Sequence, residues 1–103
     1  MAWIFLIVAG LLEVVWAYAM KQSQGFTKLV PSLVTVGAAA ASFGLLALSM
    51  RSLPLGTAYT IWTGIGAVGA FVLGVVMLGE AANPARLVAA TMIVSGLVLM
   101  KLG

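Results

Sequence analysis

The chain has 103 residues, of which 64% are hydrophobic and only 7% are charged, and its net charge is +3. Because soluble domains are about 25% charged, this composition excludes an ordinary water-soluble protein and indicates an integral membrane protein. The sequence has no cysteine and no histidine, so disulfides, the usual metal ligands and the nucleophile–base pairs of hydrolases are missing, and we expect no metal, no cofactor and no enzyme activity.

Apolar segments divide the chain into four expected transmembrane helices. A helix needs about 20 residues to cross a hydrocarbon core of about 30 Å, and each segment has that length. We expect the helices at residues 3–20, 29–50, 54–79 and 84–101. Only short turns remain between them, so residues 1–103 are predicted to form a single all-α domain in the inner (plasma) membrane.

Helix-end signals support these boundaries. Lys21 and Gly25 are typical of the end of the first helix, and Thr27 is expected to cap the second. Asn83 followed by Pro84 is typical of a capped start for the fourth helix, because proline is tolerated in the first turn.

Glu13 lies near the middle of the first helix, and its helical face also carries Gly10, Trp16 and Ala17. A charge at bilayer depth is costly and usually marks a proton or ion pathway. A carboxylate withdrawn from water binds a proton more readily, so it can exchange a proton for a cation. The alternative is a neutral carboxylic acid bonded to a neighbouring helix.

The second and third helices carry the other mid-membrane polar and aromatic side chains: Ser42, Tyr59, Thr60, Trp62 and Thr63. Aromatic faces attract a cation by about 0.5–2 kcal/mol each, and a carboxylate can accept two N–H donors of a planar cation. These residues therefore predict a cation site together with Glu13. Packing remains an alternative for the aromatic residues, an interfacial position for Tyr59, and a bond to its own helix for Ser42.

The third helix also contains closely spaced glycines. Gly64 and Gly66 lie near its middle, where paired glycines are a candidate hinge. Gly66, Ala70 and Gly74 form one face of small residues, which favours the close approach of another helix.

The fourth helix has no charge or aromatic residue at mid-span, but Ala89 and Gly96 lie seven residues apart on one face. We interpret this face as the surface for a second copy, because four short helices cannot enclose a polar path and keep their own packing. Glu80, which precedes this helix, is expected at the interface beside Arg86 without a role in transport.

The basic groups are divided almost equally between the two membrane sides. The α-amine, Arg51 and Lys101 lie on one side, and Lys21, Lys28 and Arg86 lie on the other. The positive-inside rule then gives two interpretations: orientation set by another signal, or insertion in both orientations. No basic patch interleaved with aromatic residues is present, so we expect no nucleic-acid partner.

Three segments together resemble the small multidrug resistance transporters, and most closely their guanidinium-exporter subtype, over essentially the whole chain. They are AGLLEVVWA at 9–17, GFT at 25–27 and GTAYTIWTGIGA at 56–67. Trp16 matches the guanidinium subtype, whereas Thr60 departs from it because that subtype ordinarily has alanine there.

The resemblance implies an antiparallel homodimer that exchanges protons for a cation by alternating access, with Glu13 of both subunits in a shared site. It implies that Trp16, Ser42, Tyr59 and Trp62 line that site. From their positions beside these residues, we interpret Gly10, Thr60 and Thr63 as candidate modulators of selectivity. Gly64 and Gly66 would allow the third helix to bend, and Ala89 and Gly96 would pack in the dimer.

The predicted function is proton-coupled export of guanidinium and small substituted guanidinium cations. The alternatives are a broader exporter of quaternary ammonium and hydrophobic cations, a non-transporting membrane subunit, or a subunit of a proton-binding ring. The sequence also leaves open whether a paralogous chain replaces self-pairing.

Overall fold

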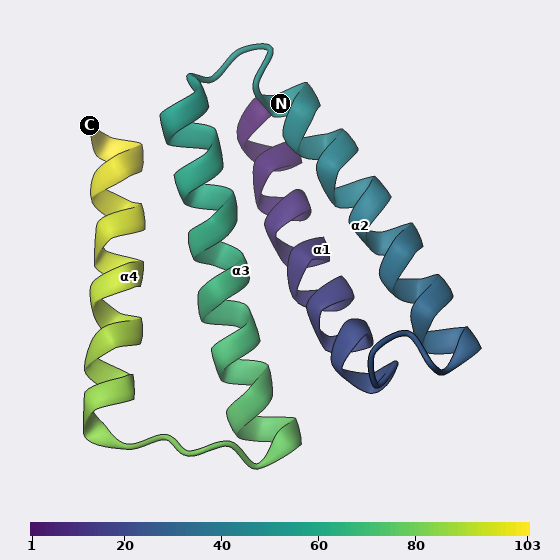
Figure 1. Cartoon of the computed structure of the whole chain (residues 1–103). Coiled ribbons are helices and arrows are strands. Elements are labelled where there is room, and N and C mark those ends of the chain that lie inside the picture. Colours follow the sequence, from purple (N-terminus) through teal and green to yellow (C-terminus); the bar gives the residue numbers. More distant parts are fainter.

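The computed structural model describes all 103 residues and consists of four α-helices joined by short turns (Figure 1). The helices are α1 Ala2–Gln22, α2 Leu29–Ser49, α3 Leu55–Leu78 and α4 Pro84–Leu102. All four are long and apolar enough to cross a membrane, so the prediction of four apolar helices is confirmed. The two termini and the α2–α3 turn lie at one end of the subunit, and the other two turns lie at the opposite end (Figure 1).

The turn between α1 and α2 is built by side-chain bonds to the backbone. The Thr27 hydroxyl donates to the carbonyl oxygens of Ser23 and Gln24, at 3.0 and 3.1 Å. Lys28, and not Thr27, occupies the N-cap of α2, so the predicted cap was wrong. The reason is that Thr27 closes the preceding turn, in which Gly25 has a left-handed φ of 75°.

The turn between α3 and α4 follows the sequence signals more closely. Gly79 ends α3 in a left-handed conformation with a φ of 70°, which glycine adopts without steric cost. The Asn83 side chain accepts the backbone N–H of Arg86 at 2.9 Å, and Pro84 is the first residue of α4. The predicted cap of α4 is therefore confirmed.

The helices form a thin slab. Helix α1 packs against α2 and α3, whereas α4 packs against α3 alone (Figure 1). The Cα atoms extend over 40 × 35 × 16 Å, which is little thicker than one helix with its side chains, about 10–12 Å. A slab of this thickness covers any central group on few sides.

The buried core is small and lies toward the end that carries the termini. Only 15 of the 103 residues are buried, so most apolar side chains face outward, as expected in lipid. The core cluster contains Leu6, Ala9, Leu46, Ala58, Ile61 and Trp62. Helix α4 contributes no buried residue. Its Lys101 ammonium lies over the Trp3 ring of α1, 5.3 Å from the ring centroid.

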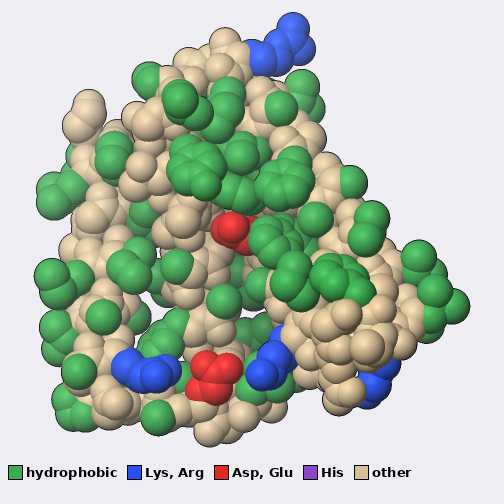
Figure 2. Space-filling model, viewed as in Figure 1, with side chains coloured by type: hydrophobic (Ala, Val, Ile, Leu, Met, Phe, Trp, Pro, Cys, Tyr) green, Lys and Arg blue, Asp and Glu red, His purple; other side chains and the backbone are tan.

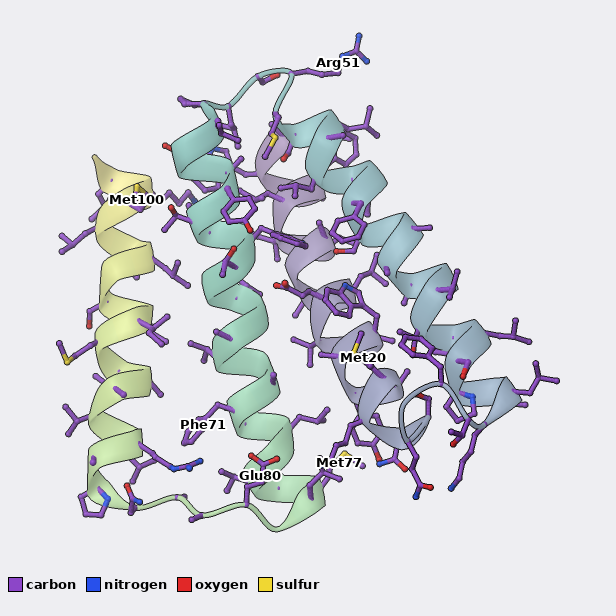
Figure 3. The ribbon with its side chains drawn as sticks, viewed as in Figure 1. Met20, Arg51, Phe71, Met77, Glu80 and Met100 are labelled. Carbon is purple, nitrogen blue, oxygen red and sulfur yellow. The ribbon has the colours of Figure 1, made fainter.

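The charged side chains concentrate at the two ends of the slab. Figure 2 shows basic side chains at both ends and one acidic side chain at mid-height among hydrophobic ones. Arg51 lies at the end with the α2–α3 turn, and Glu80 lies at the opposite end below α3 (Figure 3). This distribution fits helices that cross a membrane, with their ends at the headgroups.

Candidate functional site

Glu13 of α1 is half-buried, and its carboxyl group lies against α3. A Cβ atom added to Gly66 would collide with the Cδ and Oε1 atoms of Glu13, so the missing side chain of this glycine provides the space for the carboxyl group. The Oε1 atom is shielded from solvent and has no hydrogen-bond partner. Buried polar atoms are rarely left unpaired in proteins, and the exceptions concentrate at functional sites.

Ser42 connects three helices close to this carboxyl group. Its hydroxyl is fully buried, donates to the Ala9 carbonyl oxygen at 2.7 Å, and accepts the indole N–H of Trp62 at 3.0 Å. Ala9 lies four residues before Glu13, so in an α-helix its carbonyl belongs to the turn that carries Glu13. Ser42 therefore positions the Trp62 ring and that turn, and does not contact the carboxyl group through a hydrogen bond.

Four aromatic rings from α1, α2 and α3 form a continuous row. The ring centroids are 6.3 Å apart for Trp16 and Phe43, 5.5 Å for Phe43 and Trp62, and 5.6 Å for Trp62 and Tyr59. These tilted pairs lie in the range that is favourable for aromatic side chains. The Trp16 indole nitrogen, like the Glu13 oxygen, is buried without a hydrogen-bond partner.

Phe43 is the member of this row that sequence reasoning missed. Phenylalanine carries no charge or polar atom at bilayer depth, so it lacks the signal that identified Glu13. Its position beside Ser42, in the middle of α2, was the available indication. The structure shows that Phe43 connects the two tryptophans, which do not otherwise form a ring pair.

Thr60 and Thr63 lie on the side of α3 that borders α4. Both are exposed and line a groove of about 520 Å³ between α3 and α4. Around α3, Thr60 is displaced by about a third of a turn from Gly66, which faces Glu13. The predicted influence of Thr60 on selectivity would therefore have to act through this groove.

The glycines near the site allow close helix contacts. A Cβ at Gly10 would lie 2.7 Å from Cγ2 of Ile65, and one at Gly64 would collide with Leu97 of α4. Helix α3 runs without interruption through Gly64 and Gly66. In this conformation both residues serve packing, and the hinge stays a prediction.

Ala89 and Gly96 line grooves between α3 and α4. Ala89 borders a cavity of about 140 Å³ with Phe71 and Arg86, and Gly96 borders the groove of about 520 Å³. A Cβ at Gly96 would meet no atom within 4 Å. The face that the sequence assigned to a second copy is thus unfilled within the subunit.

The arrangement combines one intramembrane carboxyl group with aromatic walls and a hydroxyl that is fixed by two hydrogen bonds. Such a site can bind a cation through the carboxylate and the ring faces, and it can bind a proton on the same oxygen atoms. The chain has no group of three or more His, Cys, Asp or Glu residues that could hold a metal ion.

Comparison with known proteins agrees with the resemblance found in the sequence. The profile of the Small Multidrug Resistance protein family matches residues 1–93. A guanidinium exporter of Escherichia coli (strain K12) is 57% identical over 102 residues, which cover 99% of this chain and 97% of that protein. Guanidinium exporters of Citrobacter freundii and Salmonella typhimurium are each 54% identical with the same coverage. The chain therefore belongs to the small multidrug resistance family and is a multi-pass transport protein of the inner membrane.

Proposed function

We propose that this member of the small multidrug resistance family exports guanidinium and small substituted guanidinium cations in exchange for protons. The observation that carries the proposal is the Glu13 carboxyl group, which lies at mid-helix against Gly66 with one oxygen buried and unpaired. The names of the relatives, guanidinium exporters at 54–57% identity, support the choice of cation.

Guanidinium suits this site chemically. It is planar and carries N–H donors in a fork, so a carboxylate can accept two parallel hydrogen bonds from it. The faces of Trp16, Trp62 and Tyr59 would stabilise the positive charge, more strongly where water is excluded. Ser42 would hold Trp62 in place, and Phe43 would separate the two tryptophans.

We infer that residues 1–103 form one domain that works as an antiparallel homodimer. A slab with a 16 Å extent cannot enclose Glu13, and α4 buries nothing within the subunit. The nearly equal division of basic groups between the two ends favours insertion in both orientations. Because Glu13 lies near the middle of α1, two opposed copies would place both carboxyl groups at similar depth.

Transport then follows from competition for the paired carboxyl groups. Two such groups in one cavity titrate as a coupled pair, and protons and the cation exclude one another. The dimer would change its open side only when loaded, with α3 bending at Gly64 and Gly66. If two protons enter for each cation expelled, one net charge moves inward, and a potential of 100 mV contributes about 2.3 kcal/mol to that step. Each pH unit adds about 1.36 kcal/mol per proton.

Guanidinium uptake into proteoliposomes tests the function. Glu13→Gln keeps the shape of the side chain but cannot carry a charge, so we expect uptake to disappear while the protein stays dimeric in crosslinking. Lys28→Gln removes a charge at the end of the subunit and serves as the control, with uptake retained. Currents from large quaternary ammonium ions with none from guanidinium would contradict the proposed substrate class.

The pH dependence tests the coupling. A protonated carboxyl group cannot bind the cation, so the apparent Kd for guanidinium should rise as the pH falls, because protons occupy the site. Binding isotherms of reconstituted protein over a pH series measure this effect. An affinity that stays constant from acid to alkaline pH would contradict proton coupling.

A further inference from the structure

The carboxyl-terminal halves of α1 and α3 border two cavities. A cavity of about 150 Å³ lies between them, and it is lined by Ala17, Tyr18, Lys21, Ala70, Leu73, Gly74, Leu78 and Glu80. A larger cavity of about 660 Å³ adjoins the same end of α1 and shares Ala17, Lys21 and Leu78 with it. The cavities at this end reach Ala17 and Ala70, each one helical turn from Glu13 and Gly66 respectively.

Glu80 is folded back against α3 by the turn that follows the helix. The left-handed Gly79 reverses the chain, and the N–H groups of Gly79 and Glu80 both donate to the Gly74 carbonyl oxygen. A Cβ atom at Gly74 would lie 2.7 Å from Cδ and 2.8 Å from both carboxylate oxygens of Glu80. The carboxylate thus occupies the space left by a missing side chain and borders the cavity (Figure 3).

One face of α1 connects this cavity with the site. Glu13, Ala17 and Lys21 are four residues apart and lie one above the other on the helix. Ala17 lines both cavities at this end. The eight residues from Glu13 to Lys21 correspond to about 12 Å of helix, which is a short path for a small cation.

The opposing face of α3 has the same spacing. Gly66 lies against the Glu13 carboxyl group, Ala70 lines the cavity, and Gly74 lies beneath the Glu80 carboxylate. All three are small, so α1 and α3 can approach closely along this face, and Gly66 and Gly74 each leave room for one acidic side chain. The only two acids of the chain therefore lie against the two ends of one face of small residues on α3.

We propose that Glu80 is a peripheral binding site for the exported guanidinium cation, on its route between Glu13 and the membrane surface. This inference rests on the proposed function. Lys21, which lines the same cavity, is the internal cation that competes for the carboxylate. Guanidinium can displace it because its flat fork fits a carboxylate with two hydrogen bonds, whereas an ammonium group acts as a point charge. Exposed charge pairs are weak, so the site binds and releases quickly.

Kinetics of guanidinium uptake by the full protein in proteoliposomes test this site. Glu80→Gln should raise the apparent KM about two- to fivefold, the range of an exposed charge pair, with the maximal rate unchanged. Gly74→Ala should raise the KM similarly without changing any charge, because the added methyl group displaces the carboxylate. The effects should shrink at high ionic strength, since exposed charges are screened by salt.

The lysine provides a matched comparison. Lys21→Gln removes the competitor and should lower the apparent KM about twofold or more. Lys28→Gln removes the same charge at the same end of the subunit, but Lys28 caps α2 and does not line this cavity, so its KM should stay unchanged. In a Glu80→Gln background the effect of Lys21→Gln should disappear, because the two residues are coupled.

The outcomes separate the two proposals. Unchanged KM values in Glu80→Gln, Gly74→Ala and Lys21→Gln, together with loss of uptake in Glu13→Gln, would overturn the peripheral site and leave the proposed function intact. A lower maximal rate at constant KM in Glu80→Gln would also overturn it, since that result indicates a structural role. A wild-type protein that takes up no guanidinium would instead refute the proposed function.

Discussion

Small and polar residues have opposite surroundings in two regions of the molecule. The first is the seam, where α1, α2 and α3 meet at Ala9, Ser42 and Trp62. The second is the peripheral helix α4. In the seam, Ser42 has no exposed surface and Trp62 only 6%, and a hydrogen bond joins them. In α4, no residue is buried, and Thr91 donates only to a carbonyl of its own helix. Residues of the seam are buried within one subunit, whereas no residue of α4 is.

We interpret the two regions as having different roles, the seam in cation binding and α4 in association with a second copy. Polar groups at bilayer depth need partners, and among the buried side-chain nitrogen and oxygen atoms only the Glu13 oxygen and the Trp16 nitrogen have none. The unsatisfied groups are thus confined to the place where a cation would bind. Helix α4 exposes apolar and small residues, which in a membrane associate through close packing.

The largest effect is expected where the seam is tightest, at Gly66. Gly66→Ala places a methyl group on the position of the Glu13 carboxyl group, so that group must move. Overpacking of this kind costs about 1–3 kcal/mol, and we expect guanidinium uptake to fall about tenfold to hundredfold. Gly56→Ala in the same helix meets no atom within 4 Å and is the control, with uptake within twofold of wild type. Equal activity of the two variants would show that the carboxyl group does not act from this position.

The second-largest effect is expected for a substitution in α4 that changes no residue of the seam. Gly96→Leu meets open space within the subunit, so each copy should still fold. If a second copy packs against this face, the larger side chain prevents close approach, and we expect dimerisation to weaken about tenfold. Crosslinking in lipid over a dilution series measures this change.

Val94→Leu, on the opposite face of α4, is the control for that experiment. Val94 is 44% exposed and lies two residues from Gly96, about 160° around the helix. Its substitution should leave the dimer intact. If both variants dimerise like the wild type, the association surface lies elsewhere.

A third prediction compares two serines of α2 that are both fully buried. Ser42 bonds to α1 and α3, whereas Ser49 donates to Leu46 of its own helix. Interhelical hydrogen bonds in membranes contribute about 0.6 kcal/mol on average, so Ser42→Ala should slow uptake about threefold. Ser49→Ala should change it less than twofold. Tryptophan fluorescence should shift in the first variant only, because Trp62 loses its acceptor.

The sequence was sufficient to predict the four helices and the place of Glu13, because both depend on where apolar residues and charges fall along the chain. It was insufficient for Phe43 and Glu80. The contact of Phe43 with two tryptophans depends on the rotation of α2, which the Ser42–Ala9 bond fixes across 33 residues of chain. The sequence placed Glu80 at the interface beside Arg86 but did not predict the contact of its carboxylate with Gly74, onto which the left-handed Gly79 directs it. This contact depends on the left-handed conformation of Gly79, which becomes known only when the structure shows where α3 ends.

The smallest effect is expected at Thr60, on the α3 surface between the two regions. Its hydroxyl lines the α3–α4 groove and lies about a third of a turn from the side of α3 that faces Glu13. We therefore expect Thr60→Ala to change the KM for guanidinium less than twofold. Uptake of guanidinium and of a tetraalkylammonium ion, measured in parallel, shows whether their ratio moves. A ratio that changes more than fivefold would mean that the groove between α3 and α4 belongs to the substrate path. Cation binding would then not be limited to the seam.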